Sequence, residues 1–304
     1  MLNFSQDNRQ EPRSSNQGRQ FSVNLLTESR LETRRIATSR TENFVVASFL
    51  LPKAMRQSFY DIYAFCRVAD DLSDDSPSPA VALTRLDDFQ RQLDDLFANR
   101  AVEGLFVALA DTIDRYSLPK QPFDDLLDAF RQDQRKTRYA DIDEVLEYCQ
   151  RSACPVGRIL LHLTDCVDPQ NTNLSDRLCI GLQLTNFLQD VARDLQIKRV
   201  YLPEDQMQRF GVHEAMLYAS TSSPEFRQLL KSECDRASDY LHQGLELANH
   251  VPRWFAADIR LFAHGGLATL NAIRRVEFDV LSRRPTVSRW RQAAMIARAA
   301  VGLL

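Results

Sequence analysis

Apolar residues recur at intervals of three and four along most of the chain. This spacing places them on one face of an α-helix, whereas a half-buried strand alternates every second residue. We find no convincing two-residue alternation. The pattern predicts an all-α protein with nine helices, at 54–72, 79–98, 101–116, 122–133, 143–164, 174–195, 225–249, 257–281 and 286–303.

Prolines stand at most of the predicted joints between these helices, where they can start or stop a helix without disrupting it. The exception is the stretch 143–164, which carries Pro155 and Gly157 inside a helical pattern. A proline there either kinks one helix, which could widen a central cavity, or separates two shorter helices. Both interpretations stay open at this point.

The first 36 residues are rich in Gln, Ser, Asn and Arg and show neither an apolar run nor a helical stripe. We expect residues 1–36 to form a disordered polar arm rather than a domain. The remainder contains no internal repeat and no Gly-Ser linker. The sequence therefore predicts that residues 37–304 form a single domain.

Composition excludes several classes of function. The 304 residues carry a net charge of −3, so a general nucleic-acid-binding surface is not expected. The six cysteines include no CxxC pair and the five histidines show no ligand spacing, which argues against zinc and structural disulfides and suits a reducing cytoplasm. No run of 18 apolar residues could span a membrane. The basic, aromatic and apolar segment 289–304 could touch a membrane surface, although packing on the core is the favoured interpretation.

Two acidic clusters about 120 residues apart end apolar helical stretches. Their oxygen-bearing side chains recur every fourth residue, so each cluster forms one helix face. Mg²⁺ takes oxygen ligands and is commonly held by one or two carboxylates together with substrate phosphates. Solvated helix faces are the alternative, but carboxylates that follow apolar sequence usually need a metal or cation. The predicted magnesium ligands are Asp70, Asp74, Asn186, Asp190 and Asp194.

Basic side chains accompany both clusters. Arg67 lies one turn before Asp70 and Asp71, while Lys198 and Arg199 follow the second cluster. Such cations could neutralise a leaving diphosphate, whose charge the carboxylates and metal alone would not balance.

The chain resembles the squalene/phytoene synthase family over roughly residues 40–290. Three ordered stretches carry the resemblance, at 63–74, 148–157 and 183–203. The resemblance implies an isoprenoid synthase fold, a helical bundle around a central apolar cavity, with Mg²⁺ as the cofactor and a prenyl diphosphate as the substrate.

The resemblance also assigns roles to residues that the pattern alone does not. The catalytic residues that it implies are Tyr63, Arg67, Asp71 and Tyr148. The substrate-binding residues that it implies are Arg40, Thr41, Asn43, Arg67, Gln183, Gln189, Lys198, Arg199, Tyr201 and Arg283.

Departures from the family pattern indicate a branch. Gln189 stands where most members carry arginine, the stretch around Asn43 differs from the usual serine-rich sequence, and Gly266 aligns with a late tyrosine. These features resemble the hydroxysqualene synthase branch of bacterial squalene and hopanoid synthesis. Loss of an aromatic side chain at Gly266 could leave room for a water molecule.

The expected reaction is the Mg²⁺-dependent conversion of presqualene diphosphate and water to hydroxysqualene and diphosphate, a carbon–oxygen lyase activity. Expected partners are presqualene diphosphate synthase and a downstream hydroxysqualene reductase, in the cytoplasm, with peripheral contact to the inner face of the membrane left open. The alternatives are presqualene diphosphate or squalene synthesis from farnesyl diphosphate, phytoene synthesis from geranylgeranyl diphosphate, and a non-catalytic pathway scaffold.

Overall fold

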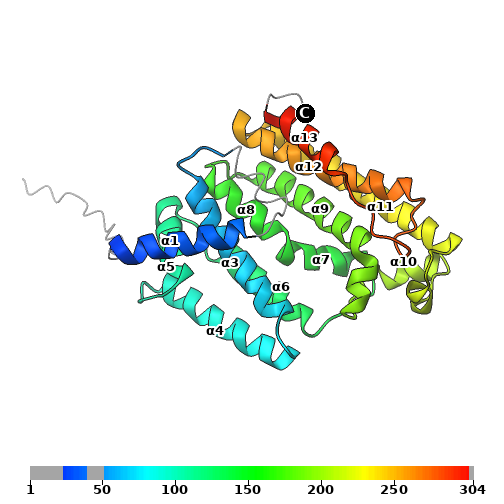
Figure 1. Ribbon diagram of the computed structural model, residues 1–304, viewed down its shortest axis with the longest axis horizontal. Helices are drawn as coiled ribbons and strands as arrows, with labels where there is room; N and C mark the ends of the chain where they lie inside the picture. The colour runs from blue at the N-terminus through cyan, green and yellow to red at the C-terminus, as the bar shows by residue number, and fades with distance from the viewer. Residues whose placement is uncertain (1–22, 40–50, 301–304) are drawn as a thin grey trace, which may run out of the picture.

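The computed structural model describes residues 23–39 and 51–300, and every regular element within these ranges is a helix (Figure 1). The prediction of an all-α fold is confirmed. The helices are α1 (Val23–Thr38), α3 (Arg56–Asp74), α4 (Pro79–Phe97), α5 (Leu105–Tyr116), α6 (Gln121–Asp133), α7 (Ile142–Ser152), α8 (Cys154–Leu163), α9 (Pro169–Gln196), α10 (Glu204–Arg209), η1 (Glu214–Tyr218), α11 (Pro224–Leu245), η2 (Glu246–Asn249), α12 (Arg253–Arg275) and α13 (Arg289–Ala300).

Two hydrophobic cores hold these helices together. One core lies among α3, α4, α5 and α6, and the other surrounds α9, α11 and α12. Helix α9 runs through the middle of the molecule, while α12 and α13 lie beside each other along one edge (Figure 1). None of the described helices combines the length and the apolar character needed to cross a membrane.

Several helices begin where proline predicted a joint. Pro79 opens α4 and Pro169 opens α9, where a missing N–H costs nothing because that group has no partner inside the helix. The preceding Ser78 and Asp168 each accept a hydrogen bond from the backbone N–H three residues on. The proline and the cap thus act together to fix these helix starts.

The helical stretch that contains Pro155 forms two helices. α7 ends at Ser152 and α8 begins at Cys154, with Ala153 alone between them. Gly157 then lets α8 lie close to α9, because a Cβ at this position would come within 2.3 Å of the Ser175 hydroxyl. The interpretation as two shorter helices is therefore the correct one.

The expected disordered arm is wrong for residues 23–36, which belong to helix α1. The buried residues of α1 are Ser29, Thr33 and Ala37, so its inner face is small and largely polar. Hydrogen bonds replace apolar burial here: the Ser29 hydroxyl donates to the Gly104 carbonyl at 2.6 Å. A search for an apolar stripe misses such a helix. Residues 1–22 lie outside the described part of the chain.

Helix α12 is shorter at its C-terminal end than its apolar pattern predicts. The pattern extends to residue 281, but α12 ends at Arg275. Glu277 and Phe278 have φ angles of +52° and +59°, a left-handed conformation that stops the helix. The non-helical residues 276–288, which we call the α12–α13 segment, therefore connect the last two helices.

Candidate functional site

A cavity of about 380 Å³ lies between α3, α6, α7, α8 and α9, where the two cores meet. Its apolar walls include Leu126, Phe130, Val156 and Phe187, while its polar wall carries residues of both acidic clusters. Among the predicted site residues, the cavity wall contains Tyr63, Arg67, Asp70, Asp74, Tyr148, Gln183, Asn186, Asp194, Arg199 and Tyr201. The fold thus gathers stretches that are far apart in the sequence around one space.

Arginines pair with the carboxylates of the first acidic cluster. Arg67 donates to Asp70 at 3.1 Å and also pairs with Asp71 on the same helix. Arg199, which follows α9, donates to Asp74 at 3.1 Å across 125 residues of sequence. This ion pair joins the two acidic helices at the mouth of the cavity.

The second cluster has an arginine partner that the sequence analysis missed. Arg284 in the α12–α13 segment donates to both oxygens of Asp190, from Nε at 2.5 Å and from Nη2 at 2.9 Å. Such a two-point contact is the strongest form of arginine–carboxylate pair. The sequence pattern offered no signal that would choose Arg284 over its neighbour Arg283.

Asp194 is the one predicted ligand carboxylate that has neither a hydrogen bond nor an ion pair among the described residues. Burial, followed by the charge of nearby Asp190, raises the pKa of Asp194 to about 7. An unpartnered, partly buried carboxylate next to further acids is a place where a cation lowers the free energy. Asp194 therefore has the environment expected of a metal ligand.

The donor set fits Mg²⁺ if the substrate supplies further oxygens. Across residues 23–39 and 51–300, no three His, Cys, Asp or Glu side chains gather closely enough to hold a metal ion by themselves. Magnesium sites usually combine one or two carboxylates with substrate phosphates and water. Of the five predicted ligands, Asp70, Asp74, Asn186 and Asp194 line the cavity and could hold Mg²⁺ there, whereas Asp190 does not line it and is paired with Arg284. The full ligand set stays a prediction.

An aromatic stack that the sequence did not reveal lies beside the acids. Phe187 and Tyr201 stack with ring centroids 3.8 Å apart and planes 8° apart. Tyr148 and Tyr139 extend the stack, with centroid distances of 5.6 Å from Tyr148 to both Tyr139 and Tyr201. Tyr148, Phe187 and Tyr201 also line the cavity, and electron-rich aromatic rings there suit a positively charged intermediate.

Asp133 is a buried acid of the cavity wall that the sequence analysis also missed. Its Oδ2 accepts a hydrogen bond from the Tyr148 hydroxyl at 2.8 Å, while its Oδ1 has no partner. Burial raises the pKa of Asp133 to about 6, although nearby Arg199 acts in the opposite direction. The Tyr148 hydroxyl is thus engaged by Asp133.

Some predicted site residues lie away from the cavity wall. Lys198 and Arg283 are exposed and do not line the cavity. Gln189 is turned toward the α12–α13 segment, where its Nε2 donates to the Pro285 carbonyl at 2.6 Å. The predicted contacts Arg40, Thr41 and Asn43 lie outside the described residues.

Comparison with known proteins shows which family has a site of this kind. Residues 37–291 match the sequence model of squalene/phytoene synthases. The chain belongs to the squalene/phytoene synthase family. Members are head-to-head isoprenyl diphosphate synthases, so the expected family, the expected fold and the expectation of an enzyme are confirmed.

Two curated relatives of this family member are named phytoene synthases. The chain is 32% identical over 285 residues to the 15-cis-phytoene synthase of Synechococcus elongatus, covering 88% of this chain and 91% of that protein. It is 32% identical to the phytoene synthase of Mycobacterium tuberculosis, covering 88% of this chain and 89% of the other.

Two solved structures share the fold over nearly their whole length. The squalene synthase HpnC of Alicyclobacillus acidocaldarius is 37% identical with a TM-score of 0.79, covering 83% of this chain and 95% of that one. A dehydrosqualene synthase is 27% identical with a TM-score of 0.83, covering 91% and 97%.

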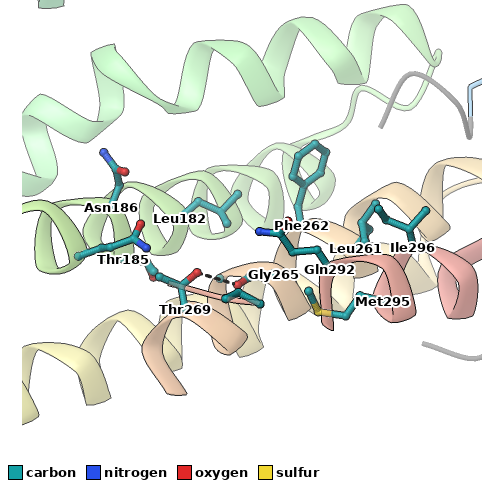
Figure 2. A pocket seen from close by; sticks show the side chains of 13 residues that line it. Leu182, Thr185, Asn186, Leu261, Phe262, Gly265, Thr269, Gln292, Met295 and Ile296 are labelled. Carbon is teal, nitrogen blue, oxygen red and sulfur yellow. Dashed lines mark hydrogen bonds between the residues drawn. The ribbon is translucent and has the colours of Figure 1, made fainter. Parts of the chain in front are cut away.

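A second pocket of about 190 Å³ adjoins the site of this family member (Figure 2). Helices α9, α12 and α13 form its walls, and Asn186 lines both this pocket and the main cavity. Its lining is mainly apolar, with polar groups from Thr185, Asn186, Gln189, Thr269 and Gln292. α13 contributes Gln292, Met295 and Ile296, so the last helix packs on the protein and closes this pocket.

Gly266 borders the second pocket but does not itself leave it open. A Cβ at Gly266 would meet Leu241 at 2.8 Å and Leu182 at 3.1 Å, so this glycine permits close helix packing. A Cβ at the neighbouring Gly265 would meet nothing within 4 Å. The free space next to α12 therefore lies at Gly265 rather than at Gly266, where we expected room for water.

Proposed function

We propose that this protein converts presqualene diphosphate and water to hydroxysqualene and diphosphate with the help of Mg²⁺, as part of bacterial squalene and hopanoid synthesis. The observation that carries the proposal is the arrangement at the cavity mouth. Acids and arginines from both acidic stretches line one cavity there, together with three rings of the aromatic stack, Tyr148, Phe187 and Tyr201. The likeness to squalene synthase HpnC and the neutral residue at Gln189 favour this branch.

Each part of the site has a task in this reaction. Bound Mg²⁺ would supply positive charge to the departing diphosphate. Arg67 and Arg199 lie on the cavity wall and can bind phosphate oxygens there. As the carbon–oxygen bond breaks, diphosphate leaves with the electron pair and the hydrocarbon becomes a cation. The faces of Tyr148, Phe187 and Tyr201 can stabilise this cation until water adds to it and loses a proton.

The reaction needs no reductant, because water forms the new carbon–oxygen bond and no hydride is transferred. Presqualene diphosphate synthase would supply the substrate, and a hydroxysqualene reductase would consume the product. Peripheral contact with a membrane would suit such an apolar product.

A second candidate is phytoene synthesis from geranylgeranyl diphosphate, which the names of the curated relatives favour. The two functions can be separated with purified protein and Mg²⁺. We would incubate it separately with presqualene, farnesyl and geranylgeranyl diphosphates, without reduced nucleotide, and identify the products by mass spectrometry. Hydroxysqualene from presqualene diphosphate alone is the expected result. Phytoene or presqualene diphosphate from the other substrates would refute the proposed step, and no turnover at all would indicate a scaffold.

A further inference from the structure

The α12–α13 segment reaches the site through a small set of contacts. Among the described residues, Gln189 and Asp190 provide all the hydrogen bonds and ion pairs that other elements make to residues 283–287. Its other end, near Asp279, is tied to the start of α11 through Ser222 and Arg227. The polar contacts of the part that carries Arg284 therefore come from two neighbouring residues of α9, while Pro285 is buried and Val287 lines the second pocket.

Gln189 makes two contacts of opposite kind with this segment. Its Nε2 donates to the Pro285 carbonyl at 2.6 Å, and its Oε1 accepts from Arg284 Nη2 at 3.2 Å. An amide can do both because it carries a donor and an acceptor, whereas an arginine at this position could only donate and would repel Arg284. Because Gln189 is neutral, Arg284 supplies the positive charge next to Asp190.

Arg284 in turn occupies both oxygens of Asp190, a side chain that is 11% exposed. A carboxylate whose two oxygens are engaged by one guanidinium has its charge already balanced. If Asp190 is to bind a divalent cation, the guanidinium must leave at least one of these oxygens. A diphosphate placed beside the metal would offer Arg284 new oxygens within the same region.

We infer that Gln189 is a positioning residue, which holds Pro285 against α9 so that Arg284 can exchange between Asp190 and the substrate diphosphate. This inference rests on the proposed function only for the identity of the diphosphate, because the competition between Arg284 and a metal for Asp190 exists without substrate. Gln189 keeps the segment docked while Arg284 changes partner.

The test uses the full-length protein and the variants Gln189→Met and Arg284→Gln. Gln196→Met is the matched control, since Gln196 is an exposed glutamine at the end of the same helix. Hydrogen exchange should be at least tenfold faster at residues 283–288 in Gln189→Met than in the control. Exchange at the wild-type rate would overturn the positioning role.

Binding of Mn²⁺, measured by electron paramagnetic resonance without substrate, tests the exchange. We expect Arg284→Gln to bind Mn²⁺ about tenfold more tightly than wild type, because a competing cation is gone. An unchanged affinity refutes the competition. In turnover assays, Gln189→Met should raise KM for the diphosphate substrate about tenfold with little change in kcat, and an unchanged KM also counts against the inference.

These arms separate failure of the inference from failure of the proposed function. If wild type converts none of the prenyl diphosphates, the proposed function is wrong, yet hydrogen exchange and Mn²⁺ binding still decide the role of Gln189. Circular dichroism establishes that each variant is folded. Should Gln189→Met not fold, Gln189→Glu, which keeps the acceptor but loses the donor to Pro285, takes its place in the exchange measurement.

Discussion

Helix α3 carries acids near both ends, and the two groups of acids have partners of opposite kinds. Asp61 is fully buried near the N-terminal end, and it accepts hydrogen bonds from Thr33, Gln57 and Thr112 at 2.6 to 2.8 Å. Burial still raises the pKa of Asp61, while these three donors act in the opposite direction. The protein has built a complete set of neutral donors around this carboxylate, which joins α1, α3 and α5.

At the other end of α3, the acids face arginines and a cavity instead. Asp70 pairs with Arg67 and Asp74 pairs with Arg199, and across the cavity Asp194 has no partner in the described chain. An arginine partner can leave the carboxylate to a metal ion and pair with a phosphate instead. A set of hydroxyl and amide donors fixed by the fold cannot. If the proposed function holds, both exposure and the kind of partner therefore distinguish the structural acid Asp61 from Asp70 and Asp74, which serve the reaction.

The largest effect that this comparison predicts is on turnover. Asp194→Asn removes the unpartnered carboxylate and should lower kcat by about 10²–10³-fold, because the reaction depends strongly on stabilising the charge that develops on the leaving group. The amide retains the size of the side chain, so the thermal midpoint should not fall. Steady-state assays and a thermal melt measure both quantities.

Asp239→Asn is the control for this experiment, because Asp239 is an exposed acid on α11. Its turnover should equal that of wild type. An Asp194→Asn enzyme that keeps its full kcat would show that the acidic cavity wall is not the reaction site.

The second effect is on stability at the other end of α3. Asp61→Ala removes an acceptor shared by three donors: Thr33 and Gln57 keep the Arg30 carbonyl as an acceptor, whereas the buried Thr112 hydroxyl loses its partner. With the cavity that the substitution leaves, the free energy of unfolding should fall by about 2–4 kcal/mol. Urea unfolding measures this change. Where the variant is folded, its kcat and KM should be those of wild type.

Asp111→Ala provides the comparison, since Asp111 on α5 makes ion pairs with Arg30 and Arg115 nearer the surface. Such pairs contribute about 0.2–1 kcal/mol. Equal losses in the two variants would contradict the claim that the donors around Asp61 matter more than a surface ion pair.

Asp258 on α12 sharpens the comparison, because it is a buried acid that has neither an arginine nor a hydrogen-bond donor as a partner within residues 23–39 and 51–300. It is 3% exposed, its Oδ1 has no hydrogen bond, and burial alone raises its pKa to about 8. Between about pH 4 and 8 the unfolded chain releases this proton while the folded protein retains it. Stability should therefore fall as pH rises through this window and level off above it.

Asp258→Asn should remove that pH dependence. At pH 8 we expect the variant to be more stable than wild type by about 5 kcal/mol, a difference that nearly vanishes at pH 4. Urea unfolding at a series of pH values measures the two curves, with Asp239→Asn as the control. Parallel curves for wild type and Asp258→Asn would mean that burial does not destabilise the ionised carboxyl.

The sequence predicted the helices and the spacing of the acids far better than it predicted the partners of those acids. Helix periodicity and proline joints located most helices, and the four-residue spacing of Asp70, Asp74, Asn186, Asp190 and Asp194 placed the acids on two helix faces. The structure brings Asn186 and Asp194 to the same cavity as Asp70 and Asp74. These features are local, so sequence spacing is enough to reveal them.

Long-range partners could not be predicted in this way. The pair of Arg284 with Asp190 spans 94 residues, and nothing in the sequence chooses Arg284 over Arg283. Helix α1 was missed because its inner face buries Ser29, Thr33 and Ala37, whose stability depends on hydrogen bonds to distant helices. Hydrogen-bond partners are set by the assembled fold, whereas apolar periodicity is written in each helix separately.

The smallest effect on stability and turnover is predicted for Tyr148, which contacts both a buried acid and the cavity. Its hydroxyl donates to buried Asp133 at 2.8 Å, while its ring belongs to the aromatic stack beside the cavity. Tyr148→Phe keeps the ring and should lower the free energy of unfolding by about 1 kcal/mol, since one buried hydrogen bond is lost. If the reaction uses the ring face, kcat should stay within about threefold of wild type.

Tyr139→Phe is the control, because it also removes a hydroxyl from the aromatic stack. That hydroxyl accepts only a long hydrogen bond from Gln132, at 3.4 Å. A fall in kcat of more than tenfold in Tyr148→Phe alone would instead assign the hydroxyl to diphosphate departure, and would move Asp133 from the structural acids to those that serve the reaction.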